Sequence, residues 1–245
     1  MKPFLLLQSR PEDAASDNEY AAFLKATGLG AHDLKRIRVE AAPLPHVNLE
    51  NYSGIIIGGG PYDISDPEET KSDTQKRVEA DVGMLLDEAV EKDFPLFGAC
   101  YGIGALGAHQ GGLINRRYSE IVAPVSITLT REGQNDPLLS GLPKTFQAIV
   151  GHKEACEMLP SHAVHLASSP ACPVQMFRIK NNLYATQFHP ELDMDGLRVR
   201  VAIYKNAGYF PPEDADAILA IAAKADLSHV PRMLQNFVKY YQRAG

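Results

Sequence analysis

The sequence has little cysteine, with 3 residues in 245, and no tryptophan. An odd and small number of cysteines does not build a disulfide framework, and it predicts a protein of a reducing compartment. The formal net charge of −6 comes without any block of lysine or arginine, so no nucleic-acid partner is indicated. No apolar run approaches the roughly 20 residues of a membrane helix. We therefore expect a globular cytoplasmic protein with neither a membrane span nor a nucleic acid as partner.

Short apolar segments alternate with helical patterns over the first half of the chain. The opening apolar run ends in a polar turn without a small-residue cleavage site, which favours a buried strand over a signal peptide. Alternating strands and helices are typical of a parallel sheet covered on both faces. The expected strands are Phe4–Gln8, Ile37–Val39, Ser53–Gly58 and Phe94–Ala99, and the expected helices are Asp17–Thr27, 68–92 and Ile103–Gln110.

The middle of the sequence is rich in β-formers, and the end is helical. Closely spaced strand patterns with a turn at Asn181-Asn182 predict hairpins that extend the sheet. We expect a single domain over residues 1–192, with residues 193–245 as its helical C-terminal extension. The strand patterns lie at Ile121–Thr130, Phe146–Gly151, Val164–Ala167, Val174–Ile179 and Leu183–Gln187, and the later helices at Gly196–Ala207, Pro212–Ala225 and His229–Arg243.

Cys100 stands where a buried strand passes into a helix, inside the segment Gly98-Ala99-Cys100-Tyr101-Gly102. A nucleophile elbow needs glycine two positions before and after the nucleophile, because the turn leaves no room for a Cβ there. The following helix N-terminus is expected to lower the pKa of the thiol. A buried structural cysteine is the alternative, and we assign that role to Cys156 and Cys172, which lack such a setting.

Two further patterns compete with this interpretation. The segment Gly102-Ile103-Gly104-Ala105-Leu106-Gly107 matches a dinucleotide-binding fingerprint. It lies in mid-chain, however, and no acidic strand end follows about 20 residues later, so we expect no dinucleotide cofactor. His162 and His165 are close enough to share a metal ion, but no third ligand is evident. We expect both to be surface residues, with no metal site.

A nucleophilic thiol needs a base and an oxyanion hole, and the sequence offers candidates for both. Three glycines and a proline at 58–61 follow the third strand and can turn backbone N–H groups toward one point. His189 follows a later strand, and Glu191 stands two residues on. The carboxylate can fix the tautomer of the imidazole, with Pro190 stiffening the spacing.

Together these motifs resemble the class I, triad-type glutamine amidotransferases. Gly-Gly-Gly-Pro at 58–61, Gly-x-Cys-x-Gly at 98–102 and Gln-Phe-His-Pro-Glu at 187–191 occur in that family's order. Gly151-His152-Lys153-Glu154, followed by Leu159-Pro160, is similar to the branch that includes the amidotransferase domain of GMP synthase. The resemblance implies a flavodoxin-like, mostly parallel sheet with helices on both faces, and it covers residues 4–192.

The resemblance also implies roles for individual residues. Cys100 would form a γ-glutamyl thioester, with His189 as general base and Glu191 as its orienter. Backbone N–H groups of Gly60 (or Gly59) and Tyr101 would form the oxyanion hole. Substrate contacts would come from position 104 and from His152 and Gln187. No cofactor is implied.

Two departures from the family shape the functional hypothesis. Position 104, where the family usually carries a glutamine that contacts the substrate, is Gly104. No phosphate-binding loop of a fused synthetase is present. We expect a stand-alone cysteine hydrolase acting on glutamine or another γ-glutamyl compound. The alternative is a non-catalytic or partner-activated subunit that binds an amino acid or delivers ammonia to a separate synthetase.

Overall fold

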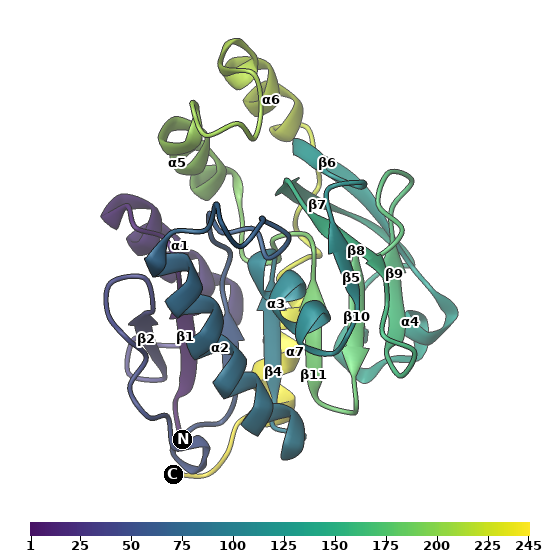
Figure 1. Cartoon of the computed structure of the whole chain (residues 1–245). Helices are drawn as coiled ribbons and strands as arrows, with labels where there is room; N and C mark the ends of the chain where they lie inside the picture. The colour runs from purple at the N-terminus through teal and green to yellow at the C-terminus, as the bar shows by residue number, and fades with distance from the viewer.

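The computed structural model describes residues 1–245 and is built on a nine-stranded mixed sheet (Figure 1). The parallel half contains β2 (Leu34–Arg38), β1 (Phe4–Gln8), β3 (Ile55–Ile57), β4 (Leu96–Ala99) and β11 (Leu183–Thr186), in that order. Antiparallel strands continue it: β10 (Met176–Ile179), β9 (Val164–Ser168), β6 (Glu120–Leu129) and β7 (Thr145–His152). The predicted parallel sheet with added hairpin strands is confirmed.

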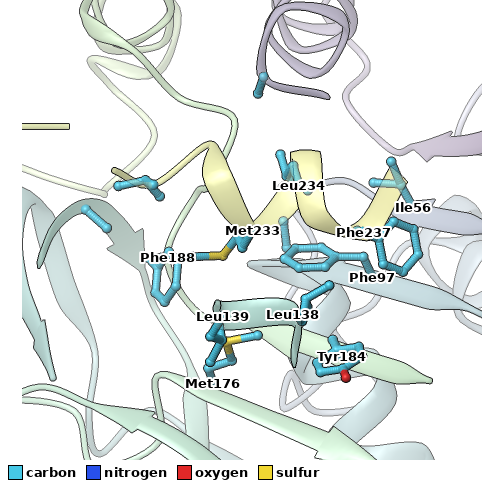
Figure 2. Close-up of a cluster of buried hydrophobic side chains, with 14 of the residues drawn as sticks. Ile56, Phe97, Leu138, Leu139, Met176, Tyr184, Phe188, Met233, Leu234 and Phe237 are labelled. Carbon is cyan, nitrogen blue, oxygen red and sulfur yellow. The ribbon is translucent and has the colours of Figure 1, made fainter. Parts of the chain in front are cut away.

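Helices cover both faces of the sheet because its central strands bury residues on both sides. Phe4 and Leu6 of β1 pack on the side of α1 (Asp13–Thr27) and α7 (Arg232–Tyr241). Leu5 and Leu7 pack on the opposite side, with α2 (Asp73–Glu91) and α3 (Tyr101–His109). Figure 2 shows Phe237 of α7 against Phe97 of β4, with ring centroids 5.8 Å apart.

Two C-terminal helices form a cap at one end of the molecule (Figure 1). They are α5 (Met194–Tyr204) and α6 (Ala215–Ala222), and they share a small apolar cluster with Ile149 of β7. The chain then returns to the sheet as α7, and Lys2 donates its backbone N–H to the carbonyl of Arg243. The last helices are therefore packed into the fold.

Several elements differ from the sequence expectation. The edge strand β2 begins at Leu34, three residues before the predicted start at Ile37. Lys35 and Arg36 face solvent, so the first half of the strand shows no apolar pattern in the sequence. A two-stranded antiparallel sheet was not predicted, and neither was a short helix. The additional elements are β5 (Leu113–Asn115), β8 (Ala155–Met158), α4 (Arg131–Asn135) and 3₁₀ turns at Leu49–Asn51, Pro137–Leu139 and Pro212–Asp214.

None of the helices combines the length and the hydrophobicity that crossing a bilayer requires.

Candidate active site

Cys100 lies at the tight junction between β4 and α3 that its glycine neighbours predict. Its φ of +52° is a left-handed conformation, in which residues other than glycine are strained. A Cβ on Gly98 would lie 2.8 Å from the carbonyl carbon of Gly102, and a Cβ on Gly102 would lie 3.2 Å from the carbonyl oxygen of Ile57. The two glycines let the strand, the turn and the helix approach this closely.

The substitution Gly98→Ala tests this elbow. Its methyl group meets backbone atoms that cannot rotate away, so we expect a loss of about 1–3 kcal/mol in the free energy of unfolding. Urea denaturation measures the loss. Gly83→Ala in α2 is the matched control, because nothing lies within 4 Å of its Cβ position. Removing a helix-interior glycine should stabilise by roughly 0.5–1 kcal/mol. Equal effects of the two substitutions would contradict the steric account of the elbow.

His189 follows β11 and is fixed by both its backbone and its ring. Its backbone N–H donates to the carbonyl of Ile149, 2.9 Å away. Its Nδ1 lies 2.9 Å from Oε1 of Glu191, and both side chains are buried. A Cβ on Gly59 would meet Cε1 of His189 at 2.8 Å and Cβ of Cys100 at 3.5 Å. The histidine and the cysteine therefore flank the same glycine and line one cavity.

A buried network of charges surrounds the histidine–glutamate pair. Arg200 of α5 donates to Oε1 of Glu191 at 2.7 Å, and its Nη1 lies 3.0 Å from Nδ1 of His189. Arg10 donates to Oε1 of Glu19 at 2.9 Å, and Arg200 lies 3.6 Å from the same oxygen. Two arginines and two glutamates thus balance one another beside the candidate nucleophile.

This network was not predicted from the sequence, although the helical periodicity of α1 and α5 indicates it. Glu19 stands four residues after Ala15 and four before Phe23, so it lies on the buried face of α1. Arg200 likewise follows Leu197 by three residues and precedes Tyr204 by four on the buried face of α5. A charged residue on an otherwise apolar helical face indicates a buried ion pair.

The electrostatics of Cys100 differ from the sequence expectation. Burial raises the pKa of the Cys100 thiol to about 12, and the nearby Arg10 only partly offsets that effect. The expected lowering of this pKa is not met, because burial penalises the charge of the thiolate. Burial also lowers the pKa of His189, and Arg200 lowers it further. The resting pair is therefore a neutral thiol beside a neutral imidazole.

Glu191 remains ionised in this buried position. Burial opposes its charge, but His189 and Arg200 together hold the pKa of this carboxyl well below its usual range. An ionised Glu191 accepts a hydrogen bond from Nδ1–H, so it fixes the tautomer whose Nε2 carries the free lone pair. The arrangement can orient a general base and stabilise the imidazolium that forms when the base takes a proton.

The glycines after β3 are not equivalent as candidates for the oxyanion hole. The N–H of Gly59 donates to Oε1 of Glu19 at 3.2 Å and is therefore already engaged. Gly60 lines both cavities that meet at Cys100. Tyr101 is the first residue of α3, where a helix leaves its N–H groups without internal partners. The geometry favours Gly60 with Tyr101 over Gly59.

The residues that the resemblance places around the substrate line a narrow polar cavity beside Cys100. They are Gly104, His152 and Gln187. The space next to Gly104 is occupied by Glu154, whose Oε1 would lie 2.8 Å from a Cβ at position 104. Glu154 is held there by the backbone N–H groups of Ile64 and Ser65, at 2.9 and 2.7 Å. A carboxylate thus stands where a longer side chain at position 104 would extend.

A second cavity, largely apolar, lies on the other side of Cys100. It has a volume of about 50 Å³ and is bordered by His189 and Arg200. The cap supplies much of its wall, through Leu197 and Val201 of α5 and through Phe210. Only this cavity reaches His189, and only the polar one reaches Gln187.

The remaining cysteines and histidines lie elsewhere. Cys156 and Cys172 are fully buried, and burial raises the pKa of both thiols. Cys172 lies with Glu120 and His152 in a second cluster of the same residue types, whose ligand atoms are all within 4.8 Å of one another. This cluster was not predictable from a local pattern, because its members are up to 52 residues apart in the chain. Cys172 does not lie on a tight strand-to-helix turn, and its thiol donates to the carbonyl of Val174.

The two predicted surface histidines have different environments. His162 is exposed, and its Nε2 lies 3.0 Å from Oε1 of Gln110. His165 is only half-buried, and its Nε2 lies 2.9 Å from the carbonyl of Ala167.

A cysteine on a glycine-lined elbow, with a histidine–glutamate pair in the segment after the neighbouring parallel strand, defines a class of α/β proteins. The family model described as glutamine amidotransferase class-I matches residues 24–200. The chain therefore belongs to the class I glutamine amidotransferase family.

Curated relatives of the chain include GMP synthases. It is 30% identical over 166 residues to the glutamine-hydrolyzing GMP synthase subunit from Thermoplasma volcanium, covering 65% of this chain and 75% of that protein. It is 29% identical over 150 residues to the glutamine-hydrolyzing GMP synthase from Borrelia garinii, covering 61% of this chain. The chain spans only 26% of that relative's length.

Solved structures share the fold over nearly the whole chain. A glutamine amidotransferase from Thermotoga maritima superposes with a TM-score of 0.77 at 18% identity, covering 98% of both chains. A glutamine amidotransferase from Methylobacillus flagellatus gives 0.74 at 20% identity, covering 100% of this chain and 97% of that one. At these identities the likeness concerns the fold.

Proposed function

We propose that this protein is a cysteine hydrolase that cleaves a γ-glutamyl amide through a thioester on Cys100. The observation that carries the proposal is the shared cavity of Cys100 and His189, with Glu191 hydrogen-bonded to the imidazole at 2.9 Å. The substrate is glutamine or a γ-glutamyl compound. Residues 193–245 act as an extension of the same domain, because α5 supplies Arg200 to the site.

In the proposed reaction, His189 takes the thiol proton as the sulfur attacks the γ-carbonyl carbon. The developing oxyanion accepts hydrogen bonds from the N–H groups of Gly60 and Tyr101. His189 then gives its proton to the leaving nitrogen as the C–N bond breaks, which leaves the thioester. Water attacks next and His189 takes its proton. The C–S bond then breaks to release glutamate, and His189 returns the proton to the sulfur of Cys100.

Acyl-group binding falls to the polar cavity. Lys153 can pair with the α-carboxylate, and Asp63 or Glu154 with the α-ammonium group. The cavity measures about 10 Å³, which is room for a single water. His152, Lys153 and Tyr209 border both this cavity and an outer depression of about 350 Å³, so we expect these side chains to move apart when a glutamyl group enters.

A substrate panel tests the proposal. The purified protein is incubated with glutamine and with γ-glutamyl peptides and amides, while glutamate and the released amine are followed. We expect glutamate from at least one of them, with wild type active and Cys100→Ala inactive. Turnover of none of them, or full activity without the Cys100 thiol, would overturn the proposal.

The alternative is a partner-activated subunit that delivers ammonia to a separate synthetase. Its support is the likeness to a relative described as one subunit of a glutamine-hydrolyzing GMP synthase. Against it, the cavity beside His189 is covered by the chain's own α5 and by Tyr209 and Phe210. A diazo-ketone analogue of glutamine separates the two accounts. We expect selective labelling of Cys100 in the isolated protein, whereas labelling that depends on an added synthetase would favour the alternative.

A further inference from the structure

Two cavities of different lining meet at Cys100: one is largely apolar, and the other also carries charged and polar side chains such as Asp63, Lys153 and Gln187. We infer that the apolar cavity beside His189 receives the leaving amine, so that the preferred substrates are γ-glutamyl amides of small aliphatic amines and not glutamine. This inference rests on the proposed function. It concerns which group leaves, whereas the proposed function concerns which bond is cleaved.

The position of His189 determines which cavity binds the leaving amine and which binds the glutamyl acyl group. The imidazole must protonate the leaving nitrogen, so the leaving group lies on the side of the thiol that His189 borders. That side is the apolar cavity, because the polar cavity does not reach the histidine. The acyl half then lies toward Gln187, whose Oε1 is buried without a partner and can accept a hydrogen bond from an α-ammonium group.

The walls of the apolar cavity suit an uncharged aliphatic group. They come from β6, β7 and the cap, through the side chains of Val122, Ile149, Leu197, Val201 and Phe210. Two arginines also border the cavity, but Arg10 is paired with Glu19 and Arg200 with Glu191. Nε of Arg200 and Nη2 of Arg10 make no hydrogen bond. The balanced charges leave no net positive charge for an anionic leaving group.

The volume of the apolar cavity limits the length of the amine that it can hold. One water needs roughly 10–15 Å³ of such a cavity, so the observed 50 Å³ holds three to five groups of that size. Ammonia occupies the volume of only one such group, so most of the apolar wall gains no contact with the leaving group. An amine of three or four carbons fills the cavity, and a single methylene group in an apolar pocket is worth about 10–200-fold in kcat/KM.

The reaction is the one proposed above with a different leaving group. Sulfur bonds to the γ-carbon, the C–N bond breaks, and the amine leaves with the proton from His189. Water then restores the free thiol, so each turnover consumes one amide and one water and releases glutamate and one amine. No oxidant, reductant or further reactant is needed.

The first test compares kcat/KM for glutamine and for the γ-glutamyl ethyl-, propyl-, butyl- and hexylamides. We expect kcat/KM to rise to a maximum at propyl or butyl, at least 10-fold above glutamine, and to fall at hexyl. The γ-glutamyl amide of β-alanine, similar in size but anionic, should be at least 10-fold poorer than the propylamide. Equal or faster turnover of glutamine, or of the β-alanine amide, would overturn the inference while leaving the proposed function intact.

The second test fills the cavity from α5. Val201→Phe places a larger side chain in it, and we expect the ratio of kcat/KM for butylamide over glutamine to fall at least 10-fold. Ala202→Phe is the matched control, because the exposed neighbour on the same helix receives the same side chain. An unchanged ratio in Val201→Phe, or an equal change in Ala202→Phe, would refute the pocket assignment. If no amide is hydrolysed and the glutamine analogue leaves Cys100 unlabelled, the proposed function itself fails.

Discussion

Replacement of Cys100 by alanine or serine is expected to lower kcat for γ-glutamyl amide hydrolysis by roughly 10⁴–10⁶-fold, the range seen when a member of a catalytic triad is removed. Alanine removes the nucleophile, and serine leaves a hydroxyl that is far less nucleophilic than a thiol at neutral pH. Steady-state release of glutamate measures the loss. Circular dichroism should show unchanged folding, because Cys100 makes no side-chain hydrogen bond at the helix start.

Cys156→Ala provides the matched control for that result. Cys156 is buried in the small β5–β8 sheet, its thiol donates to the carbonyl of Met158, and it borders neither cavity at the elbow. We expect this variant to keep kcat within a few-fold of wild type once it is folded. Parallel losses in the two cysteine variants would mean that cavity formation in the core, not removal of a nucleophile, explains the Cys100 result.

Arg200→Met is expected to be the most destabilising single change in the site. It leaves Glu191 and Glu19 facing one another with only Arg10 to balance them, and removing one partner of a buried ion pair costs about 3–5 kcal/mol. Chemical denaturation measures the free energy of unfolding. Arg198→Met is the control, because Arg198 is exposed on the same helix and pairs only with exposed Asp195, so its loss should cost less than about 1 kcal/mol.

Arg200→Met is also expected to change the pH dependence of kcat/KM. Arg200 lowers the pKa of His189 together with burial, so the histidine stays neutral, and able to act as a base, below the usual pH for imidazole. Loss of Arg200 raises that pKa, and the acid limb of the kcat/KM profile should move to higher pH. A profile that stays in place, or moves to lower pH, would contradict the electrostatic role given to Arg200.

The sequence predicted those parts of the fold whose signals are local. β1 and the turn at Cys100 lie where the apolar run and the paired glycines place them, because a buried strand and a tight turn each depend on a few adjacent residues. The His189–Glu191 hydrogen bond was likewise predictable, since the two residues are separated by one proline. The roles of Cys100, His189 and Glu191 in catalysis remain predictions.

What the sequence did not reveal depends on contacts between distant segments. Arg10 and Tyr204 are 194 residues apart, and their hydrogen bond exists only because α5 folds back over the elbow. The raised pKa of Cys100 likewise follows from burial by surrounding segments, which no local pattern records. Glu154 lies beside Gly104 because β7 and β8 carry it there from 50 residues further along the chain. Tertiary packing determines all three.

The most direct test of the central claim is mass spectrometry of protein quenched in acid during turnover of a γ-glutamyl amide. The proposed mechanism predicts a peptide containing Cys100 that carries one added glutamyl group, bound as a thioester that hydroxylamine removes. Peptides containing Cys156 or Cys172 should carry none. Turnover without any adduct on Cys100, or an adduct that forms on another cysteine, would contradict the mechanism.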